Sequence, residues 1–167
     1  NFKMKLFFKM GKPCPHLRVF FKSDDKNAFE NNSVIKVAFA DDHPLYLVSV
    51  SAIIDNHAAF RVIIKATDGK DLLDQLSKSI NPDIVLLDLI MPRMNAIETI
   101  PVLKKKVPGA KIMVLSGYSN TIDIMLIHQL GADGFLSKNA GAPELLEALQ
   151  KLLENGRYFP GYESLLL

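Results

Sequence analysis

The sequence predicts an α/β domain with a doubly wound, five-stranded parallel sheet and helices on both faces. Short apolar runs rich in β-branched residues alternate with longer helical patterns from Val34 onward. Most of the short runs are apolar at successive positions, as expected for parallel strands that helices cover on both sides. Five such strand–helix units without a long insertion fit one domain of about 120 residues.

Each expected strand is a short run bounded by turn-forming or helical segments. In chain order the expected strands are Val34–Ala40, Phe60–Ala66, Asp83–Leu89, Lys111–Ser116 and Gly134–Ser137. The third is almost wholly apolar until it reaches Asp88. A bare charge at that position is costly unless it is paired or metal-bound.

The expected helices lie after the strands, and several carry recognisable ends. In chain order they are Pro44–His57, Gly69–Ser79, Asn95–Lys106, Asn120–Leu130 and Ala142–Glu154. Asp68 can cap the second helix and Asn120 the fourth, because short polar side chains accept hydrogen bonds from the free N–H groups of a first helical turn. Gly156 lies just past the fifth helix, where glycine favours a helix end.

Composition bounds the class of protein. The chain has 167 residues, of which 49% are apolar and 23% charged, so disorder and a membrane protein are both poor interpretations. Residues 1–33 carry a net charge of +4 and residues 34–167 a net charge of −2. The mildly acidic body argues against a nucleic-acid footprint on the body itself. A single cysteine, Cys14, excludes an internal disulfide framework and suits the cytoplasm.

Residues 1–33 are expected to be a basic appendage to the domain. They alternate Phe with Lys near the start and contain Pro13 and Pro15. We expect this segment either to pack on a neighbour or to be non-native, rather than to bind a membrane or nucleic acid.

Polar side chains follow four of the expected strands at the point where each strand ends. Asp41 and Asp42 follow the first strand, and Asp88, Ser116 and Lys138 end or follow the third, fourth and fifth. Ligands and reactive groups of open parallel sheets gather at the carboxyl ends of the strands. We therefore expect three carboxylates, a hydroxyl and an ammonium to meet at one rim.

Three close carboxylates raise one another's pKa unless a cation lies between them. Oxygen ligands without His/Cys spacing indicate Mg²⁺ or Mn²⁺. A carboxylate beside a metal and a lysine can attack phosphorus and form an acyl phosphate. His43 follows two carboxylates, but a loop histidine before a helix-starting proline is more often simply exposed.

These residues resemble those of the response-regulator receiver domains of two-component signalling. The resemblance runs from about Val34 to Glu154 and includes Met91-Pro92 behind Asp88. It implies a flavodoxin-like sheet of order 2-1-3-4-5. The stretches 41–45 and 156–160 resemble the NarL/FixJ branch, whose members carry a LuxR-like helix-turn-helix. Residues 34–155 are then the receiver and residues 156–167 the start of a linker to an output domain that this chain lacks.

The resemblance also assigns a role to each residue. Asp88 is expected to be the phosphoacceptor, Asp42 and Asp88 to bind the metal directly, Asp41 to bind it through water, and the backbone carbonyl of Ile90 to complete the protein ligands. Ser116 and Lys138 are expected to bind the phosphoryl group, and Ser116 and Phe135 to act as the switch pair. Hydrolysis of the phosphoryl group is expected to be slow, because Ile90 and Tyr118 are bulky and orient an attacking water poorly.

One position departs from the family pattern. Ala96 stands where family members usually have glycine. If that backbone had a positive φ, alanine would be strained there, so we expect the loop to be helical at Ala96.

The expected partner is a sensor histidine kinase, with homodimerisation on phosphorylation, DNA contact only through an output domain, and no membrane. On this interpretation the chain is a signalling phosphoacceptor and not an enzyme.

One alternative is a stand-alone receiver that acts through protein–protein contacts. A phosphatase of the haloacid-dehalogenase kind is weaker, since it needs an acid two residues after its nucleophile, where Ile90 stands. A flavodoxin-like mononucleotide site is disfavoured because Asp41 and Asp42 would repel phosphate in the absence of a metal. A degenerate receiver that takes no phosphate is disfavoured because every reactive position is filled.

Overall fold

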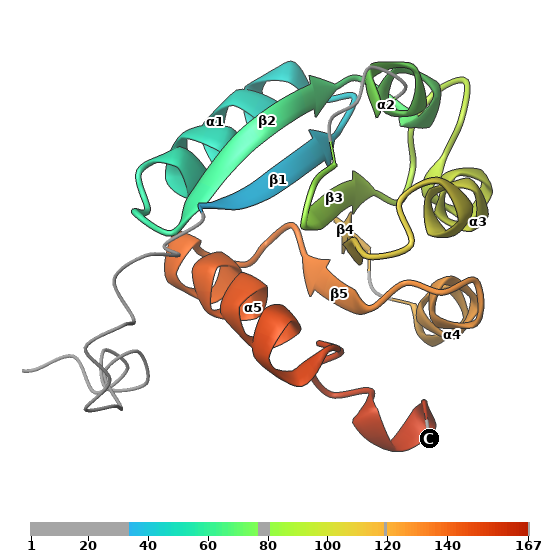
Figure 1. Ribbon diagram of the computed structural model, residues 1–167. Coiled ribbons are helices and arrows are strands. Elements are labelled where there is room, and N and C mark those ends of the chain that lie inside the picture. The colour runs from blue at the N-terminus through green and yellow to red at the C-terminus, as the bar shows by residue number, and fades with distance from the viewer. Residues whose placement is uncertain (1–33, 77–80, 119, 167) are drawn as a thin grey trace, which may run out of the picture. The chain divides into compact units, whose positions relative to one another are not determined.

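The computed structural model describes residues 34–76, 81–118 and 120–166, and its sheet has five parallel strands. The strands are β1 (Ile35–Ala40), β2 (Phe60–Ala66), β3 (Ile84–Asp88), β4 (Lys111–Ser116) and β5 (Gly134–Ser137). Their order across the sheet is β2-β1-β3-β4-β5 (Figure 1). The predicted fold class and strand order are therefore confirmed. The expected appendage, residues 1–33, lies outside the described residues.

The helices cover both faces of the sheet. They are α1 (Pro44–Asp55), α2 (Gly69–Leu76), α3 (Ala96–Lys106), α4 (Thr121–Gln129) and α5 (Ala142–Asn155). Helices α1 and α5 pack on one face, around Phe39, Leu86 and Met113. Helices α2, α3 and α4 pack on the other, around Val85, Leu87 and Val114 (Figure 1). Adjacent residues of β3 thus serve opposite cores, which explains why its sequence is apolar without alternation.

The predicted helix ends are confirmed where the structure describes them. The side chain of Asp68 accepts the Asp71 N–H at 3.0 Å, and that of Asn120 accepts the N–H groups of Ile122 and Asp123. Gly156 ends α5 with a φ of 76°, in the left-handed region that glycine adopts without strain. Ala96 is the first residue of α3, capped by Asn95, so the helical backbone expected there is also found.

The segment after α5 lies against the edge strand β5. Tyr158 forms a bridge to Gly134, donates its N–H to the Asp133 carbonyl at 2.9 Å and accepts the Phe135 N–H at 2.8 Å. Phe159 is buried, and a short 3₁₀ turn follows at Glu163–Leu165. The start of the expected linker is therefore packed on the domain, while its continuation into an output domain stays a prediction.

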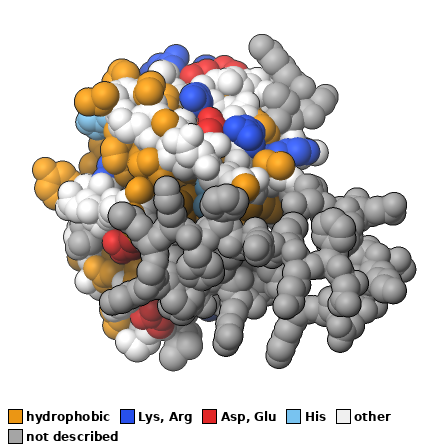
Figure 2. Space-filling view, turned by 90° about the vertical axis from the view of Figure 1, so that its left-hand side faces the viewer, with side chains coloured by type: hydrophobic (Ala, Val, Ile, Leu, Met, Phe, Trp, Pro, Cys, Tyr) orange, Lys and Arg blue, Asp and Glu red, His pale blue; other side chains and the backbone are white. Residues whose placement is uncertain are grey.

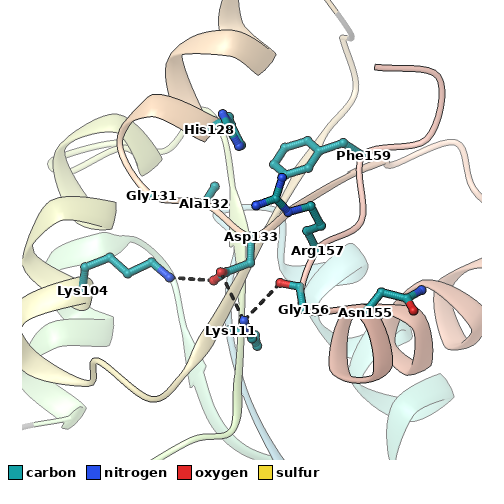
Figure 3. Close-up of a pocket in the computed structure, with 10 residues that line it drawn as sticks. All are labelled: Lys104, Lys111, His128, Gly131, Ala132, Asp133, Asn155, Gly156, Arg157 and Phe159. Carbon is teal, nitrogen blue, oxygen red and sulfur yellow. Dashed lines mark hydrogen bonds and ion pairs between the residues drawn. The ribbon is translucent and has the colours of Figure 1, made fainter. Parts of the chain in front are cut away.

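A charged cluster lines a pocket at the amino-terminal end of the sheet (Figure 3). The Asp133 carboxylate lies 2.6 Å from Lys104 Nζ and 3.5 Å from Lys111 Nζ, and it accepts the Ile112 N–H at 2.9 Å. Lys111 also donates to the Gly156 carbonyl at the end of α5. These cations lie beside helix carboxyl ends, whose partial negative charge they offset. The cluster therefore ties α3, β4, β5 and α5 together.

Helix α1 presents apolar side chains to solvent. Leu45 is 81% exposed and Val48 60%. Figure 2 faces the side of the molecule where α1 lies and shows exposed hydrophobic side chains gathered on it. None of the described helices has the length and apolar character needed to cross a membrane.

Candidate functional site

The carboxyl ends of the strands bring the predicted polar residues to one rim. Asp41 and Asp42 follow β1, Asp88 ends β3, Ser116 ends β4, and Lys138 follows β5. Asp41 is fully buried and Asp88 is only 4% exposed, so both carboxylates have little access to solvent. Buried charges of this kind need nearby partners.

Lys138 supplies the counter-charge. Its Nζ lies 2.8 Å from Asp41 Oδ2 and 2.7 Å from Asp88 Oδ2, and its side chain is 15% exposed. The Lys138 N–H donates to the Ser116 carbonyl at 2.8 Å, so the position of its backbone is fixed by β4. One ammonium therefore lies between carboxylates from two strands.

His43 also contacts the acidic cluster, although the sequence pattern predicted a simply exposed loop histidine. Its Nδ1 is 2.8 Å from Asp42 Oδ1, 3.2 Å from Asp41 Oδ1 and 4.0 Å from Asp88 Oδ2. The His43 N–H donates to Asp41 Oδ1 at 2.9 Å. The ring is nevertheless 67% exposed, so it covers the cluster at the solvent side and keeps contact with water.

The electrostatics at Asp88 reflect opposing effects. Burial raises the pKa of this carboxyl above its usual value, and the negative charge of Asp41 acts in the same direction. The hydrogen bond and positive charge of Lys138 act to lower the pKa, as does a backbone hydrogen bond from Ile90. The net effect is a raised pKa, which means that the charged form of Asp88 is disfavoured in this environment. Any further positive charge nearby would stabilise the Asp88 carboxylate.

A cavity of about 390 Å³ opens over Asp88. Its wall includes Ile90, Ser116, Tyr118 and Lys138. The Ser116 hydroxyl donates to the Tyr118 carbonyl at 2.6 Å and accepts the Tyr118 N–H at 3.1 Å, so it is engaged with its own loop. The exposed fractions of Ile90 and Tyr118 are 67% and 79%, which places two bulky, accessible side chains at the entrance.

Phe135 lies apart from this cavity. It is 4% exposed and packs in the core beneath α4, with its ring edge-on to Tyr162 at a centroid separation of 6.3 Å. In this structure it is a core residue beside the segment that follows α5.

A strained loop between β3 and α3 lies beside the site. Arg93 has a φ of 60°, a left-handed backbone conformation that is strained for residues other than glycine. Its Nε donates to Asp68 Oδ2 at 2.6 Å, and its Nη2 contacts the same oxygen. Burial acts to raise the pKa of Asp68, but hydrogen bonds from the Asp71 backbone and from Arg93 outweigh it and lower the pKa. This ion pair offsets the strain and fixes the loop that contains Ile90.

Sequence reasoning missed Tyr46, Arg93 and the proximity of His43. The Tyr46 ring lies 4.9 Å from Lys138 Nζ and lines the same cavity. A tyrosine in a largely apolar helix gives no sign in the sequence that it faces a lysine about ninety residues away. The position of Tyr46 in the first turn of the helix that directly follows Asp41 and Asp42 is the one signal that could have placed Tyr46 near the rim.

The residues present fit a divalent cation. Ligand atoms of Asp41, Asp42, His43 and Asp88 all lie within 4.8 Å of one another. Within the described part of the chain, Asp41 Oδ2 and Asp42 Oδ1 are buried and accept no hydrogen bond, although each lies 2.8 Å from a lysine or histidine nitrogen. Carboxylate oxygens with spare lone pairs are the donors that hard cations such as Mg²⁺ prefer. The cluster is typical of a Mg²⁺ site.

Comparison with known proteins decides the family. Residues 37–150 match the model of the response regulator receiver domain. The chain belongs to the response regulator receiver domain family. A receiver domain is a signalling phosphoacceptor rather than an enzyme, and its membership in two-component systems implies a cognate histidine kinase.

Relatives of known name place this receiver near one branch. The chain is 33% identical over 121 residues to the nitrate/nitrite response regulator protein NarL of Escherichia coli, covering 72% of this chain and 56% of NarL. It is 30% identical over 128 residues to the transcriptional regulatory protein DegU of Brevibacillus brevis, covering 77% of this chain and 54% of DegU. The chain thus spans about half the length of these relatives.

A solved structure agrees with the fold of this receiver. The isolated receiver of RcsB from Salmonella enterica serovar Typhimurium, determined with the phosphomimetic BeF₃⁻, superposes with a TM-score of 0.70 at 25% identity. The match covers 81% of this chain and 99% of that one. The resemblance to the NarL-type branch, expected from residues 41–45 and 156–160, is therefore supported by both sequence and structure.

Proposed function

We propose that Asp88 accepts a phosphoryl group from a phosphohistidine of a sensor kinase. The observation that carries this is the placement of Lys138 Nζ between Asp41 and Asp88, at 2.8 and 2.7 Å, beside an open cavity. An Asp88 carboxylate oxygen attacks phosphorus, the P–N bond breaks, and its electron pair leaves with the imidazole nitrogen. The product is an acyl phosphate on Asp88.

Mg²⁺ or Mn²⁺ would be held by Asp42 and Asp88 directly, by Asp41 through water, and by the backbone carbonyl of Ile90. When bound, the metal supplies positive charge for the phosphoryl oxygens. Lys138 exchanges its contact with Asp88 for a phosphoryl oxygen. The Ser116 hydroxyl turns from the Tyr118 carbonyl to another phosphoryl oxygen. The raised pKa of Asp88 supports metal binding here, because an added cation stabilises the buried carboxylate.

The output follows from movement at Ser116. We propose that Phe135, which the sequence pattern expected to turn inward but which is already buried in this structure, repacks toward Ser116 as Ser116 moves, which changes the α4-β5-α5 face and promotes homodimerisation. Ile122 and Met125 of α4 are 76% and 39% exposed, and a second copy can bury this apolar surface.

By analogy with NarL and DegU, we propose control of transcription in the cytoplasm through a DNA-binding output domain. A stand-alone receiver acting through protein contacts is the alternative.

The decisive test is incubation with acetyl phosphate and Mg²⁺, followed by intact mass measurement. The wild type is expected to gain one phosphoryl group and Asp88→Asn none, because an amide nitrogen is not nucleophilic toward phosphorus. Asp83→Asn is the matched control, since Asp83 precedes β3 at its opposite end and accepts the Lys36 N–H. No gain by the wild type, with Mg²⁺ binding demonstrated, would overturn the proposal.

The phosphoryl group is expected to persist for minutes or longer in the purified protein. Ile90 and Tyr118 are bulky side chains in the cavity wall, and the Ile90 side chain offers an attacking water no hydrogen-bonding group. Decay is measured by intact mass after donor removal, and Ile90→Asn with Tyr118→Ala is expected to shorten the half-life. A half-life of seconds in the wild type contradicts this prediction.

A further inference from the structure

Tyr46 lies where it can control the position of Lys138. It is the third residue of α1, and its ring centroid lies 4.9 Å from Lys138 Nζ. A cation over an aromatic face at this distance is attracted by the ring's quadrupole, and more strongly where water is partly excluded. Tyr46 is half-buried and Lys138 is 15% exposed, so the contact is shielded from much of the solvent.

The ring itself is held in place from beneath. Tyr46 packs edge-on against Phe39 of β1, with centroids 6.2 Å apart and an interplanar angle of 69°. Phe39 is fully buried, so the ring rests on a rigid part of the core. Burial, with the negative charges of Asp41 and Asp88, raises the pKa of Tyr46 to about 12. The ring therefore stays a neutral phenol at any physiological pH.

Lys138 needs such a support because its side chain is long and flexible. Ordering a lysine side chain in one rotamer costs conformational entropy. Its two carboxylate contacts cannot both last through phosphorylation, since Asp88 becomes an acyl phosphate. The ring face is a third contact, and it does not involve the group that is phosphorylated.

We propose that Tyr46 is a positioning residue, whose ring face holds the Lys138 ammonium over the gap between Asp41 and Asp88. The kinetic part of this inference rests on the proposed phosphoacceptor function. The positional part rests only on the contacts of Tyr46, Phe39 and Lys138. It assigns to the first turn of α1 a part in setting the rate of phosphoryl transfer.

The test compares Tyr46→Phe, Tyr46→Leu and a series of increasingly fluorinated phenylalanines at position 46. Fluorination weakens the ring quadrupole while nearly preserving its size. We expect Tyr46→Phe to match the wild type in its rate of phosphorylation by acetyl phosphate, and Tyr46→Leu to be about three- to tenfold slower. The fluorinated series is expected to slow progressively. The fluorinated series still tests the inference if the Tyr46→Leu variant fails to fold, because the fluorinated rings nearly preserve the size of the native side chain.

A second readout needs no phosphoryl donor. The ε-methylene protons of Lys138 are expected to show an upfield ring-current shift in the NMR spectra of wild type and Tyr46→Phe, and to lose it in Tyr46→Leu. Tyr158→Leu is the matched control, because Tyr158 is half-buried at the opposite end of β5. If the proposed function fails, the wild type takes no phosphoryl group but this shift remains.

Three outcomes would overturn the positioning role. They are the absence of a ring-current shift in the wild type, an equal phosphorylation rate across the fluorinated series, and a Tyr46→Phe variant as slow as Tyr46→Leu. The last would assign the effect to the hydroxyl instead of the ring face.

Discussion

Replacing Lys138 with methionine is expected to lower the free energy of unfolding, with chelator present, by about 3–5 kcal/mol at neutral pH. Methionine keeps most of the apolar stem but removes the charge. The carboxylates of Asp41 and Asp88, 0% and 4% exposed, then lose an ammonium that lay within 2.8 Å of both. A buried charge that loses its partner retains the cost of desolvation without the compensating attraction. Urea unfolding measures the difference.

Lys70→Met is the matched control for this variant. Lys70 pairs with Asp74 at 3.5 Å on the surface of α2, and its side chain is 62% exposed. Exposed ion pairs contribute little, so this substitution is expected to change stability by no more than about 0.5 kcal/mol. The double variant Lys138→Met/Asp41→Asn should recover part of the loss, because it removes one of the two stranded charges.

The loss of stability in Lys138→Met is expected to shrink as the pH falls from neutral into the acid range. Burial raises the pKa of Asp88, and Lys138 opposes that effect, so removing Lys138 raises the pKa further. A carboxyl whose pKa is higher in the folded state takes up its proton more readily there. Stability is therefore regained as pH falls through the folded-state pKa. A deficit that stays constant over this range would show that the loss comes from packing and not from charge.

The sequence was sufficient to predict that these polar side chains lie together at one rim, because of a simple property of parallel sheets. All strands end at the same edge, so residues that directly follow strands converge whatever the loops do. Asp41, Asp42, Asp88 and Lys138 meet this condition, and their mutual distances agree with it. The strand limits differed from the predicted ones by one residue at β1 and at each end of β3, where Val34, Asp83 and Leu89 lie outside the ladder.

Features that depend on tertiary contacts were not predictable in the same way. Arg93 has a positive φ because Asp68, from a different loop, holds its side chain. Tyr46 faces Lys138 because Phe39 sets the angle of its ring. In the segment after α5, expected to be the start of a linker, Phe159 and Tyr162 pack on the core beside β5, a contact that the sequence did not indicate. Each of these contacts joins positions whose relation is fixed only when helices are placed on the sheet.

Gly69→Ala is expected to destabilise the protein by about 3 kcal/mol, as measured by urea unfolding. Gly69 begins α2, and a Cβ at this position would lie 1.9 Å from Thr99 Oγ1 and 2.8 Å from the Met94 carbonyl oxygen. Thr99 cannot move aside easily, because it is fully buried and its hydroxyl donates to the Asn95 carbonyl at 2.6 Å. The helix must therefore shift away from α3.

Gly109→Ala is the control, since a Cβ there would meet nothing within 4 Å. It is expected to leave stability unchanged or to raise it slightly, by up to about 1 kcal/mol. Adding Thr99→Ala to Gly69→Ala should relieve only part of the loss, because the clash with the Met94 carbonyl remains. Equal stability of the Gly69 and Gly109 variants would show that α2 tolerates displacement from α3.

The same substitution is expected to weaken Mg²⁺ binding and slow phosphorylation of the molecules that remain folded. The Gly69 N–H donates to the Met94 carbonyl at 3.0 Å, and its neighbour Asp68 binds Arg93. Two successive residues at the start of α2 thus hold the β3–α3 loop, whose Ile90 carbonyl is the proposed metal ligand. A methyl group at position 69 pushes on this loop where it is anchored. Isothermal titration with Mg²⁺ tests this, and an affinity equal to that of the wild type would show that the loop is positioned independently of α2.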